Sequence, residues 1–237
     1  MRYVILYFIS NILEIYMPSL TNLVAPPSLK EMAFQAIKEA ILSNKLEPGK
    51  IYNEQALAKE LGISKTPVRE ALLDLAARGF VTFLPRRGVQ VNVLTEKDIR
   101  DLYNFRAALE TAIIRCITPR VTDETIRRIE AIYKKEEEAI RNDNRRGYLK
   151  IDREFHLSLA SLSENQYMIL ALENVRDLID WMGWKALLRK ERMLEVYEEH
   201  GRIIQRLKER DTEGAVKMME EHIRVTKENV LNWLRKL

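Results

Sequence analysis

Three histidines and one aspartate are the residues of this sequence that could bind a metal ion. The chain of 237 residues contains only three histidines, and His156, His200 and His222 all lie in its second half. Asp152 precedes His156 by four residues, so both side chains lie on the same face of a helix. Three imidazoles and one carboxylate suit borderline metals such as Zn, Ni, Co, Mn or Fe, and suit Ca or Mg poorly.

The other two histidines fall on apolar faces of predicted helices. His200 is in phase with Val196, Ile203, Ile204 and Leu207, and His222 is in phase with Ala215, Met219, Thr226 and Trp233. A single buried histidine is usually a core residue with its own hydrogen-bond partner. Three inward-facing imidazoles and an inward-facing carboxylate would each need a partner, and one divalent ion would satisfy all four. Spacing alone leaves both interpretations open.

A second group of residues could contact nucleic acid. In the stretch GISKTPVREALLDLAARGFV, residues 62–81, Lys65 and Arg69 lie one turn apart at the start of a predicted helix. The helix dipole disfavours cations at that end, and a polyanion bound there would offset the cost. A helix that follows another after a glycine turn forms a helix-turn-helix, whose second helix enters the major groove. Ser64, Lys65, Thr66 and Arg69 would then lie at the DNA.

A predicted β-hairpin follows this helix pair. The β-like runs 80–84 and 89–94 are joined by Pro85-Arg86-Arg87-Gly88, which places Arg86 and Arg87 at the tip. Gly88 would permit the backbone to approach DNA closely. Two arginines at a turn can equally be solvated side chains, but the preceding helix pair favours DNA contact.

The sequence pattern predicts a mainly α-helical protein in two domains. Helices near 29–43, 54–61 and 64–78 precede the hairpin and form an N-terminal winged helix-turn-helix, three helices with a β-hairpin wing. An all-α antiparallel helical bundle follows, with helices near 96–117, 122–142, 147–162, 166–188, 191–208 and 212–235. The predicted divisions are an N-terminal extension at 1–28, the DNA-binding domain at 29–94 and the helical domain at 95–237.

Charge and composition agree with this division. Residues 29–93 contain 10 Lys and Arg against 7 Asp and Glu, whereas residues 94–237 contain 28 against 27. The single cysteine, Cys116, excludes a disulfide within the chain and a thiolate zinc cluster, and it is predicted to be a buried apolar side chain. The apolar segment 1–17 is short and polar for a membrane span, so we expect a cytoplasmic protein in which Met17 is an alternative start.

The DNA-binding half resembles a known family. The segment ALAKELGISKTPVREALLDLAARGFVTFLPRRGVQVNVL closely resembles the winged helix-turn-helix of GntR-type bacterial transcriptional regulators. The resemblance implies contacts to bases or phosphates from Lys65, Thr66, Arg69 and Gly88. Gln55 stands where the family often has a DNA-contacting arginine, and Lys65 stands where arginine is frequent, so the operator sequence stays open.

The helical half resembles the metal-containing FCD domain of the FadR-like subfamily. The matching segments are LYNFRAALE at 102–110, DREFHLSLASLSEN at 152–165 and EEHGRIIQRLKERDTEGAVKMMEEH at 198–222. The resemblance implies one divalent metal and a small organic acid effector bound beside it. The implied metal ligands are Asp152, His156, His200 and His222.

Two further residues are assigned to the effector. Arg106 is the candidate partner for the carboxylate of the acid, because guanidinium pairs bidentately with carboxylate. A salt bridge with Glu110 one turn further on is the alternative role for Arg106. Asn165 is also assigned to the effector site, with a helix cap as its alternative role.

Together these patterns predict a metabolite-responsive regulator, expected to be a repressor that binds a palindromic operator as a homodimer. The helical domain at 95–237 is expected to bind the effector and the metal and to form the dimer. A helix shift beside the metal would be passed through residues 92–97 to the DNA-binding domain. The alternatives are a purely structural metal, or a metal-dependent enzyme fused to a DNA-binding domain. Glu199 and Glu221 are expected to face away from the metal, and no H-E-x-x-H pattern occurs, so no general base is evident.

Overall fold

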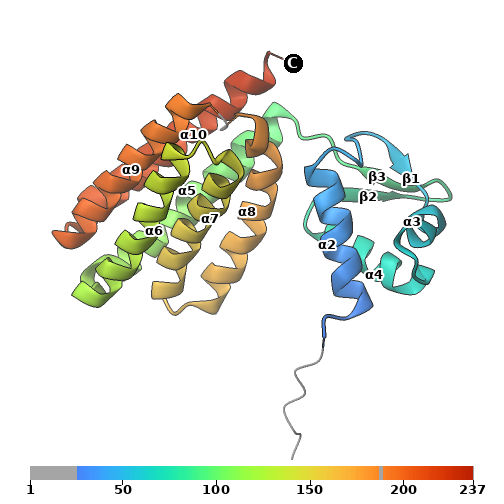
Figure 1. Cartoon of the computed structure of the whole chain (residues 1–237), viewed down its shortest axis with the longest axis horizontal. Helices are drawn as coiled ribbons and strands as arrows, with labels where there is room; N and C mark the ends of the chain where they lie inside the picture. The colour runs from blue at the N-terminus through green and yellow to red at the C-terminus, as the bar shows by residue number, and fades with distance from the viewer. Residues whose placement is uncertain (1–25, 187–188, 237) are drawn as a thin grey trace, which may run out of the picture.

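The computed structural model describes residues 26–186 and 189–236 and has a winged helix-turn-helix beside a helical bundle (Figure 1). Most of the predicted N-terminal extension, Met17 included, lies outside the described residues. The elements of the first half are α2 (Leu29–Leu42), β1 (Ile51–Tyr52), α3 (Glu54–Leu61), α4 (Lys65–Ala77), β2 (Val81–Leu84) and β3 (Gly88–Val91).

Local capping interactions explain where the first helices begin and end. Ser28 and Glu31 form a capping box at the start of α2. The side chain of Asn53 accepts hydrogen bonds from two backbone N–H groups at the start of α3, and Gly62 ends this helix with a left-handed φ of 68°. The predicted helices of this half are therefore present within one or two residues.

The sheet contains one strand, β1, that the sequence pattern did not predict. Its order is β1-β3-β2, and both pairs are antiparallel. β1 has only two residues, too few to show an alternating pattern, so periodicity does not predict it. Gly88 has a φ of 120°, and a Cβ at this position would lie 2.3 Å from the carbonyl oxygen of Tyr52. The pairing of β1 with β3 therefore requires the glycine, independently of DNA.

The second half is the predicted helical bundle. Its elements are α5 (Glu96–Ile117), the short 3₁₀ helix η1 (Thr118–Arg120), α6 (Asp123–Arg141), α7 (Arg145–Leu162), α8 (Gln166–Ala186), α9 (Lys190–Lys208) and α10 (Thr212–Leu234). α7 begins two residues before the predicted start because Asn144, and not Gly147, caps it. Cys116 in α5 is half-buried, not fully buried as predicted.

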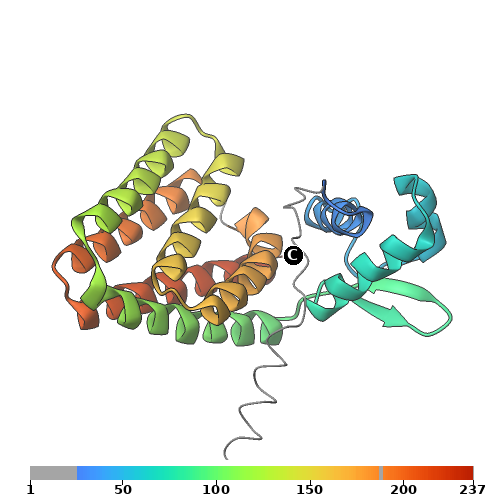
Figure 2. The ribbon, with the colours of Figure 1, turned by 90° about the horizontal axis from the view of Figure 1, so that it is seen from below.

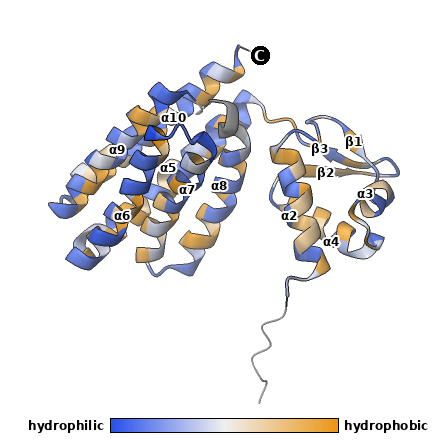
Figure 3. Cartoon of the chain, in the orientation of Figure 1, coloured by the Kyte–Doolittle hydropathy of each residue, from blue (hydrophilic) through white to orange (hydrophobic). Residues whose placement is uncertain are grey.

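Packing in the bundle brings distant segments of the chain together. α5 packs along α10, α6 packs against α7 and α9, and α7 packs against α8. Each labelled bundle helix carries both hydrophilic and hydrophobic residues, as expected of amphipathic helices around a core (Figure 3). None of the described helices is both long enough and apolar enough to cross a membrane.

α8 is the bundle helix that contacts the winged helix-turn-helix. Figures 1 and 2 show α8 on the side of the bundle that faces α2. Leu178 and Trp181 of α8 pack against the hydrophobic core of the first half. The Trp181 ring lies 5.5 Å, centroid to centroid, from the ring of Phe80. The two halves therefore share an apolar contact as well as a covalent connection.

Candidate metal centre and DNA-contacting surface

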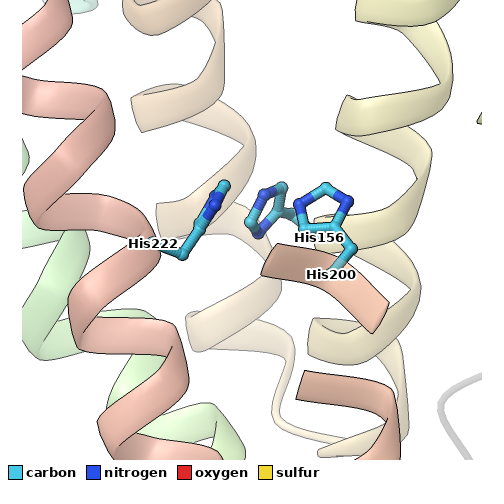
Figure 4. A group of neighbouring side chains, drawn as sticks. All are labelled: His156, His200 and His222. Carbon is cyan, nitrogen blue, oxygen red and sulfur yellow. The ribbon is translucent and has the colours of Figure 1, made fainter. Parts of the chain in front are cut away.

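The three histidines converge inside the bundle from three different helices. His156 comes from α7, His200 from α9 and His222 from α10, and their rings point toward one another (Figure 4). One nitrogen of each ring lies within 4.8 Å of a nitrogen of the other two. All three side chains are almost completely buried. The predicted helical phases therefore place the imidazoles correctly.

Each imidazole faces its own buried carboxylate on the outer side of the cluster. Nδ1 of His156 lies 2.5 Å from Glu110, Nδ1 of His200 lies 2.9 Å from Glu136 and Nδ1 of His222 lies 2.7 Å from Glu199. A carboxylate at Nδ1 accepts that proton, so Nε2 keeps its lone pair for the inner side. Histidines that bind metals in proteins almost always have such an outer partner.

The inner nitrogens are suited to an ion. Nε2 of His200 and Nε2 of His222 are buried and have no hydrogen-bond partner within the described residues. A buried polar atom without a partner is costly, and a bound ion would remove the cost. Two ligand atoms on a tetrahedral zinc ion are about 3.4 Å apart, and the nitrogens of this cluster all lie within 4.8 Å of one another. The residues present fit a divalent transition metal.

Asp152 completes the predicted ligand set. Its Oδ1 lies 3.9 Å from Nε2 of His156 and 3.8 Å from Nε2 of His200. Its other oxygen, Oδ2, pairs with the guanidinium of Arg176. Burial would raise the pKa of this carboxyl, but the guanidinium of Arg176 outweighs burial and holds the pKa low. Asp152 is therefore an anion that is available to a cation beside the imidazoles.

Two of the imidazoles are held in the neutral form that binds metals. Burial lowers the pKa of His222 to about 4, and it lowers the pKa of His156 well below its usual value. Burial acts in the same direction at His200, but the carboxylate of Glu136 outweighs it and the pKa is raised. A proton therefore competes with a metal chiefly at His200.

Arg106 lies directly beside the cluster. Its Nε donates to Glu110 at 2.5 Å, and its Nη2 lies 3.0 Å from Nε2 of His156. Arg106 also lines a cavity of about 10 Å³ together with Asp152, Arg176 and His222. Arg106 therefore forms the salt bridge with Glu110 and also lies at the candidate metal site. The cavity holds about one water molecule.

Two predicted positions differ in the structure. Asn165 is exposed and caps α8, where its side chain accepts from the N–H groups of Tyr167 and Met168, and it does not line the cavity. Glu199 was expected to face away from the cluster, but it is buried against His222 and Arg192. The helical face shared by Glu199 and Arg192 lies next to His222 of α10, which spacing within α9 alone did not reveal.

The predicted DNA-contacting residues gather around one groove. A groove of about 430 Å³ lies between α3, α4 and the wing, and the predicted residues lining it are Gln55, Lys65, Arg69, Arg86, Arg87 and Gly88. Ser64 and Thr66 are exposed at the start of α4. Ser64 is the N-cap residue of α4, but its side chain makes no capping hydrogen bond. The first turn of α4 is therefore exposed beside four basic residues.

Glu54 also lines this groove, although no motif of the sequence assigned it to DNA contact. Its Oε2 lies 3.5 Å from Arg69 and 3.6 Å from Lys65, and its side chain is only 14% exposed. The same oxygen has no hydrogen-bond partner within the described residues. A carboxylate under two exposed cations restricts their positions before DNA arrives. Its place directly after the Asn53 cap was the only signal in the sequence.

Comparison with known proteins identifies both halves. Residues 29–91 match the model for bacterial regulatory proteins of the gntR family, and residues 101–225 match the FCD domain. The chain is 30% identical over 198 residues to the Nta operon transcriptional regulator of Aminobacter aminovorans, which covers 82% of this chain and 90% of that protein. The chain belongs to the GntR family of bacterial transcriptional regulators.

One further sequence relative and one solved structure are consistent with this family assignment. The HTH-type transcriptional repressor RspR of Escherichia coli is 24% identical over 213 residues, covering 89% of this chain and 92% of that one. The structure of E. coli McbR/YncC has the same fold, with a TM-score of 0.74, 20% identity and coverage of 88% of this chain and all of that one. The McbR/YncC structure supports the fold, and the two family models together with the Nta operon regulator indicate a DNA-binding regulator and not an enzyme.

Proposed function

We propose that this GntR-family regulator binds one divalent transition metal per chain, from among Zn, Ni, Co, Mn and Fe, through Asp152, His156, His200 and His222. The observation that supports this most is the pairing of each imidazole Nδ1 with its own buried carboxylate while the Nε2 atoms face one another. The bound metal would act as a Lewis acid that holds an anionic ligand.

The ligand of the proposed site is a small carboxylic acid. With Nε2 of His156 bound to a metal, Arg106 would lose its contact with that nitrogen, and its guanidinium would be free to pair with a carboxylate. The cavity beside it, at about 10 Å³, is too small for such an acid in this conformation. Binding must therefore move the surrounding helices. That requirement gives the acid unequal affinity for two conformations, as any effector needs.

The DNA-binding half reads the operator with the groove between α4 and the wing. Arg69 and Lys65 are proposed to contact base edges, with Gln55, Ser64, Thr66, Arg86, Arg87 and Gly88 at bases or phosphates. In support, six of these residues line one groove. Because helix-turn-helix proteins read paired half-sites as dimers, we propose a homodimer on a palindromic operator in the bacterial cytoplasm, acting as a repressor. The two functional parts divide between residues 29–94 and 95–237.

The metal is tested first by elemental analysis of purified protein. We expect about one equivalent of a transition metal in the wild type and its loss in His156→Ala and in His222→Gln. Glu137→Gln, which changes an exposed carboxylate of α6, should retain the metal and serves as the control. Full metal content in both histidine variants would overturn the ligand assignment.

Sensing is separated from a purely structural metal by a second measurement. Carboxylic acids should raise the melting temperature of the metal-loaded protein and change its operator affinity, and a chelator should abolish both effects. A metal that raises the melting temperature, with no acid changing operator affinity, would make the site structural. Operator binding itself is tested with Arg69→Ala, which should cost about 1–3 kcal/mol and relax the sequence preference.

A further inference from the structure

Helix α8 touches both functional parts of the protein. On its inner side, Arg176 and Ile179 line the cavity beside the histidines. On its outer side, Leu178 and Trp181 pack against the core of the winged helix-turn-helix. A movement that enlarges the cavity at α8 therefore also acts on the DNA-binding half.

Asp177 of α8 is an ionic junction between the two halves. Its side chain is only 3% exposed, and three cations surround it. Lys38 of α2 lies 2.5 Å from Oδ1, and Arg78 lies 3.1 Å from Oδ2. Arg153 of α7 lies 2.9 Å from Oδ1. Arg78 is the C-cap residue of α4, the helix proposed to read DNA, so the junction ends on that helix.

The same ion pairs continue inward to the proposed metal site. Arg153 also pairs with Asp180 at 2.7 Å, and Asp180 lies 3.8 Å from Arg176. Arg176 is itself buried and pairs with Asp152, one of the four proposed metal ligands. An unbroken series of alternating charges thus joins Asp152 to α2 and α4.

We propose that this series, the ion-pair relay, couples the metal and effector site to the DNA-reading helix. The relay consists of Asp152, Arg176, Asp180, Arg153 and Asp177, with Lys38 and Arg78 at its outer end. The inference rests on the proposed function, because it assigns the regulatory connection of that same metal and effector site.

Charge and burial explain why the relay transmits a movement. A metal bound to Oδ1 of Asp152 would draw the negative charge of this carboxylate away from Arg176, which pairs with Oδ2. An acid that enlarged the cavity would also displace Arg176, because this side chain lines it. Leaving a buried ion without its partner is costly, so a shift of Arg176 is followed by Asp180 and Arg153. The ion pairs of the Asp177 carboxylate with Arg153, Lys38 and Arg78 then rearrange. The orientation of α4 changes with it.

The relay bypasses the covalent connection between the halves. The predicted route through residues 92–97 starts at Asn92, which is anchored to the first half through its bonds with the carbonyl groups of Gly79 and Phe80. That connection can move as a unit with the DNA-binding domain. The relay instead reaches α4 directly from α7 and α8.

Arg153→Met is the variant that cuts the relay without separating the halves. It removes the link between Asp180 and Asp177, yet it leaves Asp177 paired with Lys38 and Arg78. Asp177→Asn is a second cut, at the junction itself. Glu154→Gln is the matched control, because Glu154 is the next residue of α7 and its ion pair with Lys135 lies outside the relay.

The readout is backbone hydrogen exchange of the full-length protein with Zn²⁺ alone and after chelation. In the wild type and in Glu154→Gln, Zn²⁺ should change exchange in α8 and also in α2 and the end of α4. In Arg153→Met the change in α8 should persist, while the change in α2 and α4 falls at least fivefold. The same pattern is expected of Asp177→Asn.

Two results would overturn the relay. One is a wild-type protein in which Zn²⁺ leaves α2 and α4 unchanged, and the other is an Arg153→Met protein whose response equals that of the wild type. Zinc content and operator binding are measured on the same samples. These two measurements test the proposed function independently of the relay. If zinc content and operator binding are normal but hydrogen exchange does not respond as expected, the relay is wrong and the proposed function still stands.

Discussion

Replacing Glu136 by glutamine tests the outer carboxylates of the metal site. Glu136 is fully buried in α6, and both of its oxygens lie near Nδ1 of His200, at 2.9 and 3.1 Å. Glutamine has nearly the same shape and keeps an oxygen that accepts from Nδ1–H. The ring stays oriented, but it loses the negative charge that makes Nε2 a stronger metal ligand.

The expected loss is large in metal affinity and small in the stability of the metal-free protein. Removing an outer partner of a metal-binding histidine lowers metal affinity by about 10- to 100-fold, or about 1.4–2.8 kcal/mol. Burial raises the pKa of Glu136, because the charged carboxylate is poorly solvated there. Replacing it by a neutral amide should therefore change the free energy of unfolding without metal by less than about 1 kcal/mol.

Competition titration with a chromophoric chelator measures the affinity, and thermal unfolding with and without Zn²⁺ measures the stabilisation. The Zn²⁺-induced rise in melting temperature should be about 3–10 °C smaller in Glu136→Gln than in the wild type. Glu137→Gln, on the exposed side of the same helix, should behave as the wild type does. Equal zinc affinity in Glu136→Gln and the wild type would refute the reasoning.

Three further outcomes are expected. Glu54→Gln should raise the affinity for non-specific DNA and lower operator specificity by about 1 kcal/mol, because Arg69 loses the carboxylate that restrains it. Fluorescence anisotropy measures both affinities, and an unchanged ratio of specific to non-specific affinity would contradict this prediction. Phe155→Ala should lower the free energy of unfolding in urea by about 3–5 kcal/mol, since the ring is fully buried; a loss below 1 kcal/mol would count against it. Arg235 holds the pKa of Glu96 at about 2, so the contribution of this ion pair to folding stability is full above pH 4.5 and is lost as the pH falls through about 2. In Arg235→Gln, an NMR titration should give Glu96 a pKa nearer 4.5. A pKa equal to that of the wild type would exclude the ion pair as the cause.

The sequence was sufficient to predict the inner residues of the candidate metal site. The spacing of Asp152 and His156 and the helical phases of His200 and His222 depend only on the geometry of single helices. The outer carboxylates depend on packing between helices. Glu110 comes from α5 and Glu136 from α6, and nothing in their own spacing relates them to histidines elsewhere in the chain.

The same distinction holds for the rest of the molecule. The helices and the wing were predicted from caps, glycines and periodicity, which are local signals. β1 was not predicted because two residues carry no periodicity. Asn165 was assigned to the effector site, but in the structure its side chain caps α8. The ion pairs of Asp177 with Lys38 and Arg78 join residues about a hundred or more positions apart, so no local pattern could indicate them.

The last helix of the chain carries a consequence for synthesis. The histidine cluster draws on α7, α9 and α10, and α10 also packs along α5. Because domains fold as they leave the ribosome, the winged helix-turn-helix can form before His222 has been made. A polypeptide that ended before residue 212 would keep the DNA-reading surface and lack the cluster. Such a product would contain Asp152, His156 and His200 but not His222, so under the proposed function the metal site could form only after the final helix had been made.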